Sequence, residues 1–383
     1  MNFFDVLRAE VKFIFTDVAI VLTIIGGVIL YSFLYPQPYA KESVSSLSVS
    51  VVDLDKSDIS RHIIFALNAT PQVNVIRQDL SERDAKNALE ATLVKAIVVI
   101  PAHFKRDLAL GVSPTIAVGA DSSYFLIYGA VLEGAMKAVL TESAKIKVAN
   151  LLKAEVPLSS AKDAYTPYTV NSINLFNKNN SYTEYVVPAV FILILQQTLL
   201  IGLGILGGGA NERLKKGNVL HLRVAKTYQV MLSRFIIFGL LFFVHMLFYF
   251  GFSYEMFSVT HIANITDLLL FGVVFLSAVI AFGLFLGSLF SSREIATPAI
   301  LFSSLPLIFS VGFIWPVEMI PQSIIYLSYL APSTPAIKGF LELNQMGASL
   351  FMVGESLIIL LLQIVVYTIL GYYFINKNRN QNG

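Results

Sequence analysis

Two aspartates, Asp53 and Asp55, directly follow a run of β-forming residues, and of all side chains in the sequence they are the best placed for covalent chemistry. An aspartate in such a position is the nucleophile of enzymes that form an aspartyl phosphate. However, no second catalytic cluster follows, and aspartates that close a strand are more often turn formers and helix caps. Ser57 and Ser60 can cap the next helix. We therefore interpret this motif as a structural turn.

Nucleotide, metal and thiol chemistry find no support in the sequence. Gly202, Gly204 and Gly207 satisfy GxGxxG, but they lie in an apolar run, whereas the nucleotide fingerprint requires a strand before it and a helix after it. We interpret these glycines as sites of close helix packing. Neither GxxxxGK followed by Ser or Thr nor HExxH occurs, and there is no cysteine. We expect no enzyme activity, no bound cofactor and no metal.

The composition is that of a membrane protein with one soluble domain. Hydrophobic residues make up 56% of the chain and charged residues 14%, against averages of roughly 45–50% and 25%. Residues 36–184 hold 30 of the 52 charged side chains, 15 basic and 15 acidic. Because that segment has no net charge, a nucleic-acid partner is excluded. The predicted fold class is a polytopic α-helical membrane protein with an inserted extracytoplasmic α/β domain.

Six transmembrane helices are expected, each about 20 mostly apolar residues long. They cover about 18–35, 185–207, 233–252, 267–290, 297–315 and 350–375. Of the 12 Lys and Arg residues outside 36–184, 11 lie in the termini and alternate connections, and the remaining one is Lys338. By the positive-inside rule both termini and the 208–232 loop are cytoplasmic, and 36–184 lies outside.

The first residues show helical periodicity. The apolar residues are Phe3, Leu7, Val11, Ile14 and Val18, and Asp5, Arg8 and Lys12 fall on the other face. This pattern is equally compatible with a helix lying in the membrane interface and with an extension of the first span. Three regions follow: the N-terminal helix and first span (1–35), the external domain (36–184) and a five-helix region (185–383).

The external domain alternates between strand and helix patterns. Strands are expected at 47–54, 72–76, 96–100 and 115–118, helices at 57–69 and 81–93, and one long amphipathic helix from 124 to about 155. Ser81 with Asp84 is a variant of the capping box. These elements predict a small α/β layer fold.

Three sets of residues resemble the bacterial type-2 ABC exporter permeases. They are Val52-Asp53-x-Asp55-x-Ser57-x-x-Ser60-Arg61, then Val99-Ile100-Pro101-x-x-Phe104 with Gly111 and Asp121-Ser122, and finally Gly312-x-x-x-Pro316-x-Glu318-x-x-Pro321 with Pro332-x-Thr334. The resemblance covers nearly the whole chain. It implies that two permease copies, identical or related, pair around a central path and are driven by separate cytoplasmic ABC ATPase subunits, which hydrolyse the ATP.

The resemblance also implies where the ATPase docks. In the family an acidic residue and a glycine after the second span contact the ATPase, and the matching positions are Glu212 and Gly217. Asn218 stands where threonine is usual, and the downstream proline is missing. The loop is also strongly basic, with Arg213, Lys215 and Lys216. We expect this loop to couple ATP hydrolysis to transport.

The expected function is the permease subunit of an exporter that moves a hydrophobic or amphipathic compound out of the cytoplasm or the bacterial inner membrane. Gln196, Gln197, Phe309 and Phe313 are candidates for the translocation path, although for the two glutamines we favour hydrogen bonds between helices. The family implies a possible periplasmic adaptor protein and outer-membrane channel as further partners, beside membrane lipid. The alternative is a receptor or scaffold that does not transport and binds a ligand outside the cell.

Overall fold

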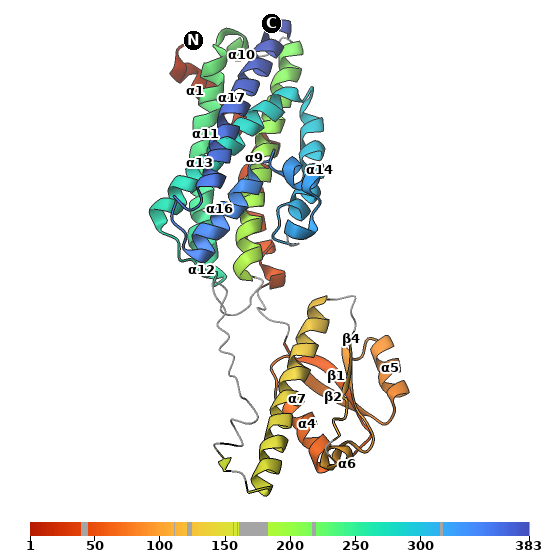
Figure 1. Ribbon diagram of the computed structural model, residues 1–383. Helices are drawn as coiled ribbons and strands as arrows, with labels where there is room; N and C mark the ends of the chain where they lie inside the picture. Colours follow the sequence, from red (N-terminus) through yellow and green to blue (C-terminus); the bar gives the residue numbers. More distant parts are fainter. Residues whose placement is uncertain are drawn as a thin grey trace. The chain divides into compact units, whose positions relative to one another are not determined.

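The computed structural model divides into two units, and each is described by itself. It describes residues 1–39, 45–110, 112–120, 125–155, 157–158, 160, 183–216, 220–314 and 317–382. Met1–Glu42 and Asn174–Gly383 form the helical unit, and Ser43–Ile173 form the α/β unit. In Figure 1 the helical unit holds both chain termini, which lie at the same end of it together with α10.

The helical unit is built from long helices and short connecting ones. Its N-terminal part contains α1 (Phe3–Phe15), α2 (Val18–Val21), the π-helical turn η1 (Leu22–Gly27), α3 (Val28–Leu34) and η2 (Gln37–Tyr39). Next come α9 (Thr183–Lys216), α10 (Leu220–Val224), α11 (Thr227–Leu247), the second π-helical turn η3 (Phe248–Ser253) and α12 (Tyr254–Met256). The last elements are α13 (Ile265–Leu289), α14 (Arg293–Ser310), η4 (Val317–Met319), α15 (Gln322–Ser328), α16 (Ser333–Met346) and α17 (Gly354–Asn382).

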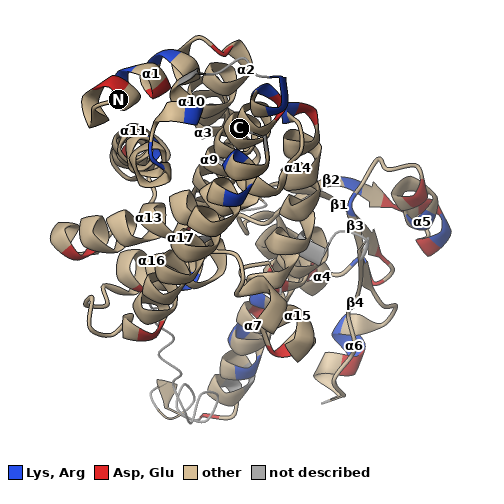
Figure 2. Cartoon of the chain, turned by 90° about the horizontal axis from the view of Figure 1, so that it is seen from above, with Lys and Arg blue, Asp and Glu red and all other residues tan. Residues whose placement is uncertain are grey.

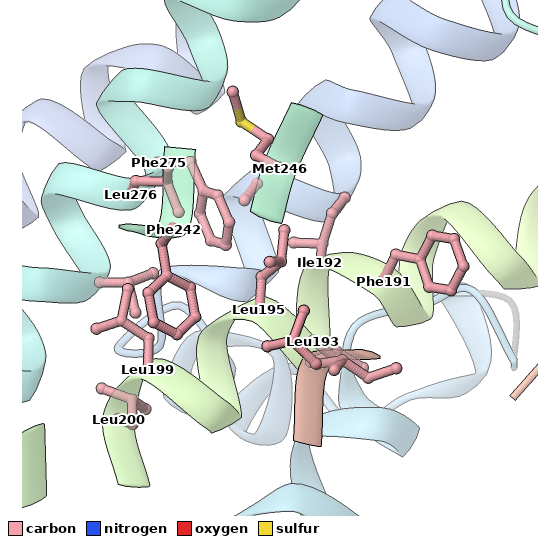
Figure 3. Close-up of a cluster of buried hydrophobic side chains, with 14 of the residues drawn as sticks. Phe191, Ile192, Leu193, Leu195, Leu199, Leu200, Phe242, Met246, Phe275 and Leu276 are labelled. Atoms are coloured by element: carbon pink, nitrogen blue, oxygen red, sulfur yellow. The ribbon is translucent and has the colours of Figure 1, made fainter. Parts of the chain in front are cut away.

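Helix α9 is the centre of this unit. It contacts α13, α14, α16 and η1, and most of its side chains are buried. Figure 3 shows Leu195 and Leu199 of α9 in one buried cluster with Phe242 of α11 and Phe275 of α13. The helix within 186–216 is 94% buried, whereas the similarly apolar helices within 227–256 and 354–381 are only 28% and 22% buried. The other helices therefore pack around α9.

Four described helices are long and apolar enough to cross a membrane, those within 186–216, 227–256, 265–289 and 354–381. The pair Phe3–Phe15 and Val18–Leu34 qualifies as a fifth, but it bends by 77°. The predicted fifth span, 297–315, corresponds to α14, which has 18 residues and contains Pro298 and Pro306. At 1.5 Å per residue it is about 27 Å long, less than the ~30 Å of hydrocarbon. A total of six spans stays a prediction.

The bend between α1 and α2 shows that α1 is a separate helix, not an extension of the first span. Asp17 caps the new helix by accepting hydrogen bonds from the backbone N–H groups of Ala19 and Ile20. Val6, Glu10 and Ile14 of α1 are buried, whereas Val11 is exposed. The charge on Glu10 is paired inside the protein. The interfacial position of α1 stays a prediction.

The segment 316–349, which lies between the predicted fifth and sixth spans and for which no helix was predicted, contains α15 and α16. Helix α16 contacts α9, α13 and α17, and its Phe340 is almost completely buried between Phe271 and Phe275. The segment was missed because no stretch of it is long enough to span a bilayer. A 14-residue helix can nevertheless be buried when larger helices surround it.

The α/β unit contains a four-stranded sheet and four helices among its described residues. The strands are β1 (Leu47–Asp53), β2 (Val73–Asp79), β3 (Ala96–Ile100) and β4 (Ala117–Ala120), and the helices are α4 (Asp58–Asn68), α5 (Glu82–Glu90), α6 (Phe104–Ala109) and α7 (Phe125–Lys153). The strand order is β2-β1-β3-β4. Strand β1 is parallel to β2 and β3, and β4 is antiparallel to β3.

Alternation along β1 explains how this sheet is covered. Val49 and Val51 point to the face that packs against α4 and α7, where Ile63 and Val131 complete the core. Helix α5 contacts β1 and β3 from the opposite face (Figure 1). Such a two-sided arrangement is expected for strands joined by helical crossovers. Ser81 caps α5 through the backbone N–H of Asp84, which confirms the predicted cap.

Candidate coupling surface and candidate groove

Small residues allow α9 to approach its neighbours closely. A Cβ atom on Gly207 would lie 2.5 Å from the backbone of Gly287 in α13, and one on Gly208 would lie 2.4 Å from the Ser292 carbonyl oxygen. At Gly202 the nearest atom would be Ile24 Cγ2, at 2.5 Å. All three distances are shorter than a real Cβ contact. The glycines thus allow the close helix packing that the sequence predicted.

Charged residues gather at the end of the helical unit that holds both termini. Figure 2 shows them on α1, on α10 and near the C-terminus. At the end of α9, Glu212 Oε1 accepts a hydrogen bond from Lys216 Nζ at 2.7 Å, and the Arg213 guanidinium lies 4.4 Å from the centre of the Phe13 ring. Lys215 is exposed. Gly217 lies outside the described residues.

The predicted loop at 208–232 is mostly helical. Helix α9 continues to Lys216, α10 occupies Leu220–Val224, and α11 begins at Thr227. Arg379 of α17 supports this region by donating hydrogen bonds to the Thr227 hydroxyl, at 2.8 Å, and to the carbonyl oxygen of Ala225. The basic side chains are thus presented by a short helical hairpin tied to the end of the last helix.

Beneath this surface lies a buried ion pair that the sequence did not reveal. Glu10 of α1 is fully buried, and its Oε2 accepts a hydrogen bond from Arg234 Nε of α11 at 2.9 Å. His221 Nε2 of α10 lies 3.3 Å from the other carboxylate oxygen. One carboxylate therefore connects α1, α10 and α11. The usable signal was the spacing of Val6, Glu10 and Ile14, which places Glu10 on a face with two apolar residues.

A second ion pair links the bend to α14. Arg293 Nη2 donates to Asp17 Oδ1 at 3.0 Å, so the residue that caps α2 also holds the first residue of α14. Asn211 of α9 donates to the carbonyl oxygens of Ser288 and Phe290 just before that helix. These contacts fix the charged ends of α9, α13 and α14 to one another.

A groove of about 570 Å³ lies between η1 with α3, α9 and α14. Its lining is apolar apart from hydroxyl and amide groups, and includes Leu30, Leu193, Ile194, Gln197, Leu301 and Ile308. No charged side chain occurs among the described residues that line it. A concave apolar site of this size is typical of small-molecule binding sites.

The four residues predicted for the translocation path occupy different environments. Gln196 is fully buried, and its amide oxygen accepts from the Ser333 backbone N–H at 2.6 Å, which holds the start of α16. Gln197 lines the groove and is 8% exposed. Phe309 of α14 is 50% exposed and is not among the residues that line the groove.

The fourth, Phe313, is buried beside a separate cavity of about 280 Å³ between the end of α14 and α15–α16. Lys338 and Glu342 of α16 also line that cavity. Burial raises the pKa of the Glu342 carboxyl, whereas a hydrogen bond to Glu355 raises that of the Lys338 ammonium. The structure thus brings Gln197 alone of the four candidates into the larger groove.

In the α/β unit the two aspartates form a turn. Asp53 Oδ1 accepts hydrogen bonds from the backbone N–H groups of Asp55 and Lys56, and its Oδ2 accepts from the Ser60 hydroxyl at 2.7 Å. Asp55 accepts from the backbone N–H of Lys105. Both carboxylate oxygens of Asp53 therefore accept hydrogen bonds within the turn and the helix that follows it. This agrees with the interpretation of Asp53 and Asp55 as a structural turn.

The described residues hold no group of three or more His, Asp or Glu side chains that could bind a metal ion.

No curated protein matches this chain. A family model described as "ABC-2 family transporter protein" matches residues 18–373, which is nearly the whole length. The match begins at the bend after α1 and ends in α17, so it includes every helix around the groove. The chain therefore belongs to the ABC-2 transporter family and is a membrane permease of an ABC transporter, a family that implies an ATPase partner.

Proposed function

We propose that this permease exports a hydrophobic or amphipathic compound from the cytoplasm or the inner membrane of a bacterial cell, powered by separate ATPase subunits. The observation that carries the proposal is the groove, whose apolar walls come from three different helical segments. Such walls bind apolar surface without the cost of removing charged groups from water. Movement of any one segment would change the width of the groove.

The ATPase is proposed to dock on the surface formed by Glu212, Arg213, Lys215 and Lys216, with Gly217 beside it. Support comes from the clustering of charge at one end of the helical unit and from the rigid base that the Glu10 ion pair provides beneath it. The excess of Lys and Arg at this end, which also holds both termini, supports a cytoplasmic location for it. The α/β unit then lies outside the cytoplasm.

A second permease copy is the proposed partner within the membrane. Support comes from apolar side chains of α14 that are exposed in the single chain: Phe302 is 82% exposed and Leu305 is 64% exposed. Membrane lipid and a second helix bundle both suit such a surface. A periplasmic adaptor and an outer-membrane channel are proposed to contact the α/β unit.

The absence of cysteine allows a direct test of the groove. Leu30→Cys introduces a thiol in the groove, and Leu362→Cys introduces one on an exposed face of α17 away from it. Each variant is reconstituted with the ATPase and treated with an apolar maleimide. We expect modification of Leu30→Cys to abolish export-coupled ATP hydrolysis and modification of Leu362→Cys to leave it unchanged. Equal effects would contradict the proposal.

The docking surface is tested by charge reversal. Glu212 and Glu355 both accept a hydrogen bond from a lysine at 2.7 Å, but Glu355 starts α17 at the opposite end of the helical unit. We expect Glu212→Lys to yield an inserted protein that no longer couples ATP hydrolysis to transport, while Glu355→Lys still does. If Glu212→Lys retains full substrate-stimulated ATPase activity in the reconstituted complex, the docking proposal fails.

A further inference from the structure

The side chain of Gln197 stands out in the wall of the groove. Val190, Leu193, Ile194, Gln197 and Ile201 recur at three and four residues along α9, and all of them line the groove. Residues at this spacing lie on one face of a helix. Gln197 is thus an amide within an otherwise apolar stripe. The side chain of its neighbour Gln196 points from another face of the helix and is hydrogen-bonded to Ser333.

Both polar atoms of the Gln197 amide are buried and have no hydrogen-bond partner among the described residues. Gln72, Gln345 and Gln363 each have one such atom, whereas Gln197 has two. A buried amide that makes no hydrogen bond is less stable than the same amide in water. Anything that offers both an acceptor and a donor to this amide would therefore gain free energy on binding.

The two threonine hydroxyls that line the groove already have backbone partners. The Thr198 hydroxyl donates to the Ile194 carbonyl oxygen at 2.6 Å, and the Thr23 hydroxyl donates to the Ala19 carbonyl oxygen at 2.8 Å. Among the described lining residues there is also no charged side chain to compensate an ion. An ionic ligand would lose its hydration without a counter-charge. The walls thus favour an uncharged occupant.

We propose that the groove selects an uncharged, largely apolar compound that carries an amide-like pair of hydrogen-bond donor and acceptor, and that Gln197 binds this pair. The inference rests on the proposed role of the groove in export and adds the class of substrate and the residue that selects it. The groove volume of about 570 Å³ fits a drug-sized molecule.

The test compares four probes with one alkyl chain: N-methyldecanamide, methyl decanoate, decanoate and decylammonium. Purified permease in nanodiscs is titrated with each probe, and the rise in its unfolding temperature gives the apparent Kd. We expect N-methyldecanamide to bind about tenfold more tightly than methyl decanoate, because the ester lacks the N–H donor. The two ions should bind more weakly still.

Two substitutions assign the preference to Gln197. In Gln197→Leu the amide and the ester should bind equally, which removes the tenfold difference. In Gln197→Glu the new carboxylate should make decylammonium the preferred probe. Leu362→Gln, which places an amide on an exposed position of α17, is the matched control and should keep the wild-type preference.

Each outcome decides between the proposals. An amide-to-ester ratio near one in the wild type, or a ratio that Gln197→Leu does not change, overturns the inference while the maleimide test of export still stands. If Gln197→Leu instead changes the permease from dimer to monomer in nanodiscs, a second copy occupies the groove and the inference is also wrong. If the probe selectivity is as expected but the maleimide test fails, the proposed export function is contradicted, whereas the proposed binding site at Gln197 still stands.

Discussion

The two units place similar ion pairs in opposite surroundings. In the α/β unit Lys105 Nζ and Asp58 Oδ1 are 2.7 Å apart, and both side chains are more than half exposed. In the helical unit Arg234 and Glu10 are 2.9 Å apart, and both are almost completely buried. Exposed pairs contribute little because water and salt screen them. A buried pair must stay complete, since removal of one partner leaves a charge without compensation.

Removal of one member of the buried pair should have the largest effect. We expect Glu10→Leu or Arg234→Met to lower the free energy of unfolding by about 3–5 kcal/mol, and the double variant to recover most of that loss. The measurement is denaturant unfolding of the permease in micelles. If either single variant lowers the free energy of unfolding by no more than the loss of an exposed pair does, the contrast drawn between the two units is wrong.

The next prediction concerns backbone contact. Gly207→Ala would place a Cβ atom 2.5 Å from Gly287, and we expect it to cost about 1–3 kcal/mol because α9 and α13 must separate. Gly129→Ala in α7 of the α/β unit is the control, since no described atom lies within 4 Å of its Cβ position. It should stabilise the protein by up to about 1 kcal/mol. Thermal unfolding of the two variants should therefore shift in opposite directions.

Gln196 and Gln197 allow the same comparison, between a buried polar group with partners and one without a described partner, within a single helix. Gln196→Leu leaves the Ser333 N–H and hydroxyl without their partner, so we expect a loss of about 1–3 kcal/mol. Gln197→Leu removes an amide that has no described partner and should leave the stability of the ligand-free protein unchanged or higher. Denaturant unfolding of both variants checks this. Equal losses would show that Gln197 has a partner in the protein.

The smallest effect is expected at the partly exposed Arg77–Asp79 pair, and it depends on pH. Hydrogen bonds from Arg77 and Ser50 lower the pKa of the Asp79 carboxyl below its ordinary value. A lowered pKa in the folded state contributes stability above the ordinary value and loses it as the pH falls through the lowered one. Asp79→Asn should therefore destabilise the protein slightly at pH 7 and by less as the pH falls. A deficit that is unchanged at acid pH would contradict this assignment.

Local patterns in the sequence predict much of this fold. The strand at 96–100 was predicted with its observed bounds, because four consecutive β-branched residues define it locally. Glu10 and Arg234 could not be paired beforehand, since 224 positions separate them and each resembles an ordinary surface charge. The roles of Gln196 and Gln197 were equally hidden. A step of one residue rotates the side chain by about 100°, and only the neighbouring helices decide what it meets.

The two π-helical turns meet inside the helical unit. Tyr249 of η3 is fully buried, and its hydroxyl donates to the carbonyl oxygen of Val28, the residue directly after η1, at 2.7 Å. Leu22 and Gly26 of η1 belong to the groove wall. A π turn holds one residue more than an α turn. If η1 released that residue, the preceding segment would rotate by about 100° relative to α3. Different side chains of that segment would then face the groove, while α9 stayed in place.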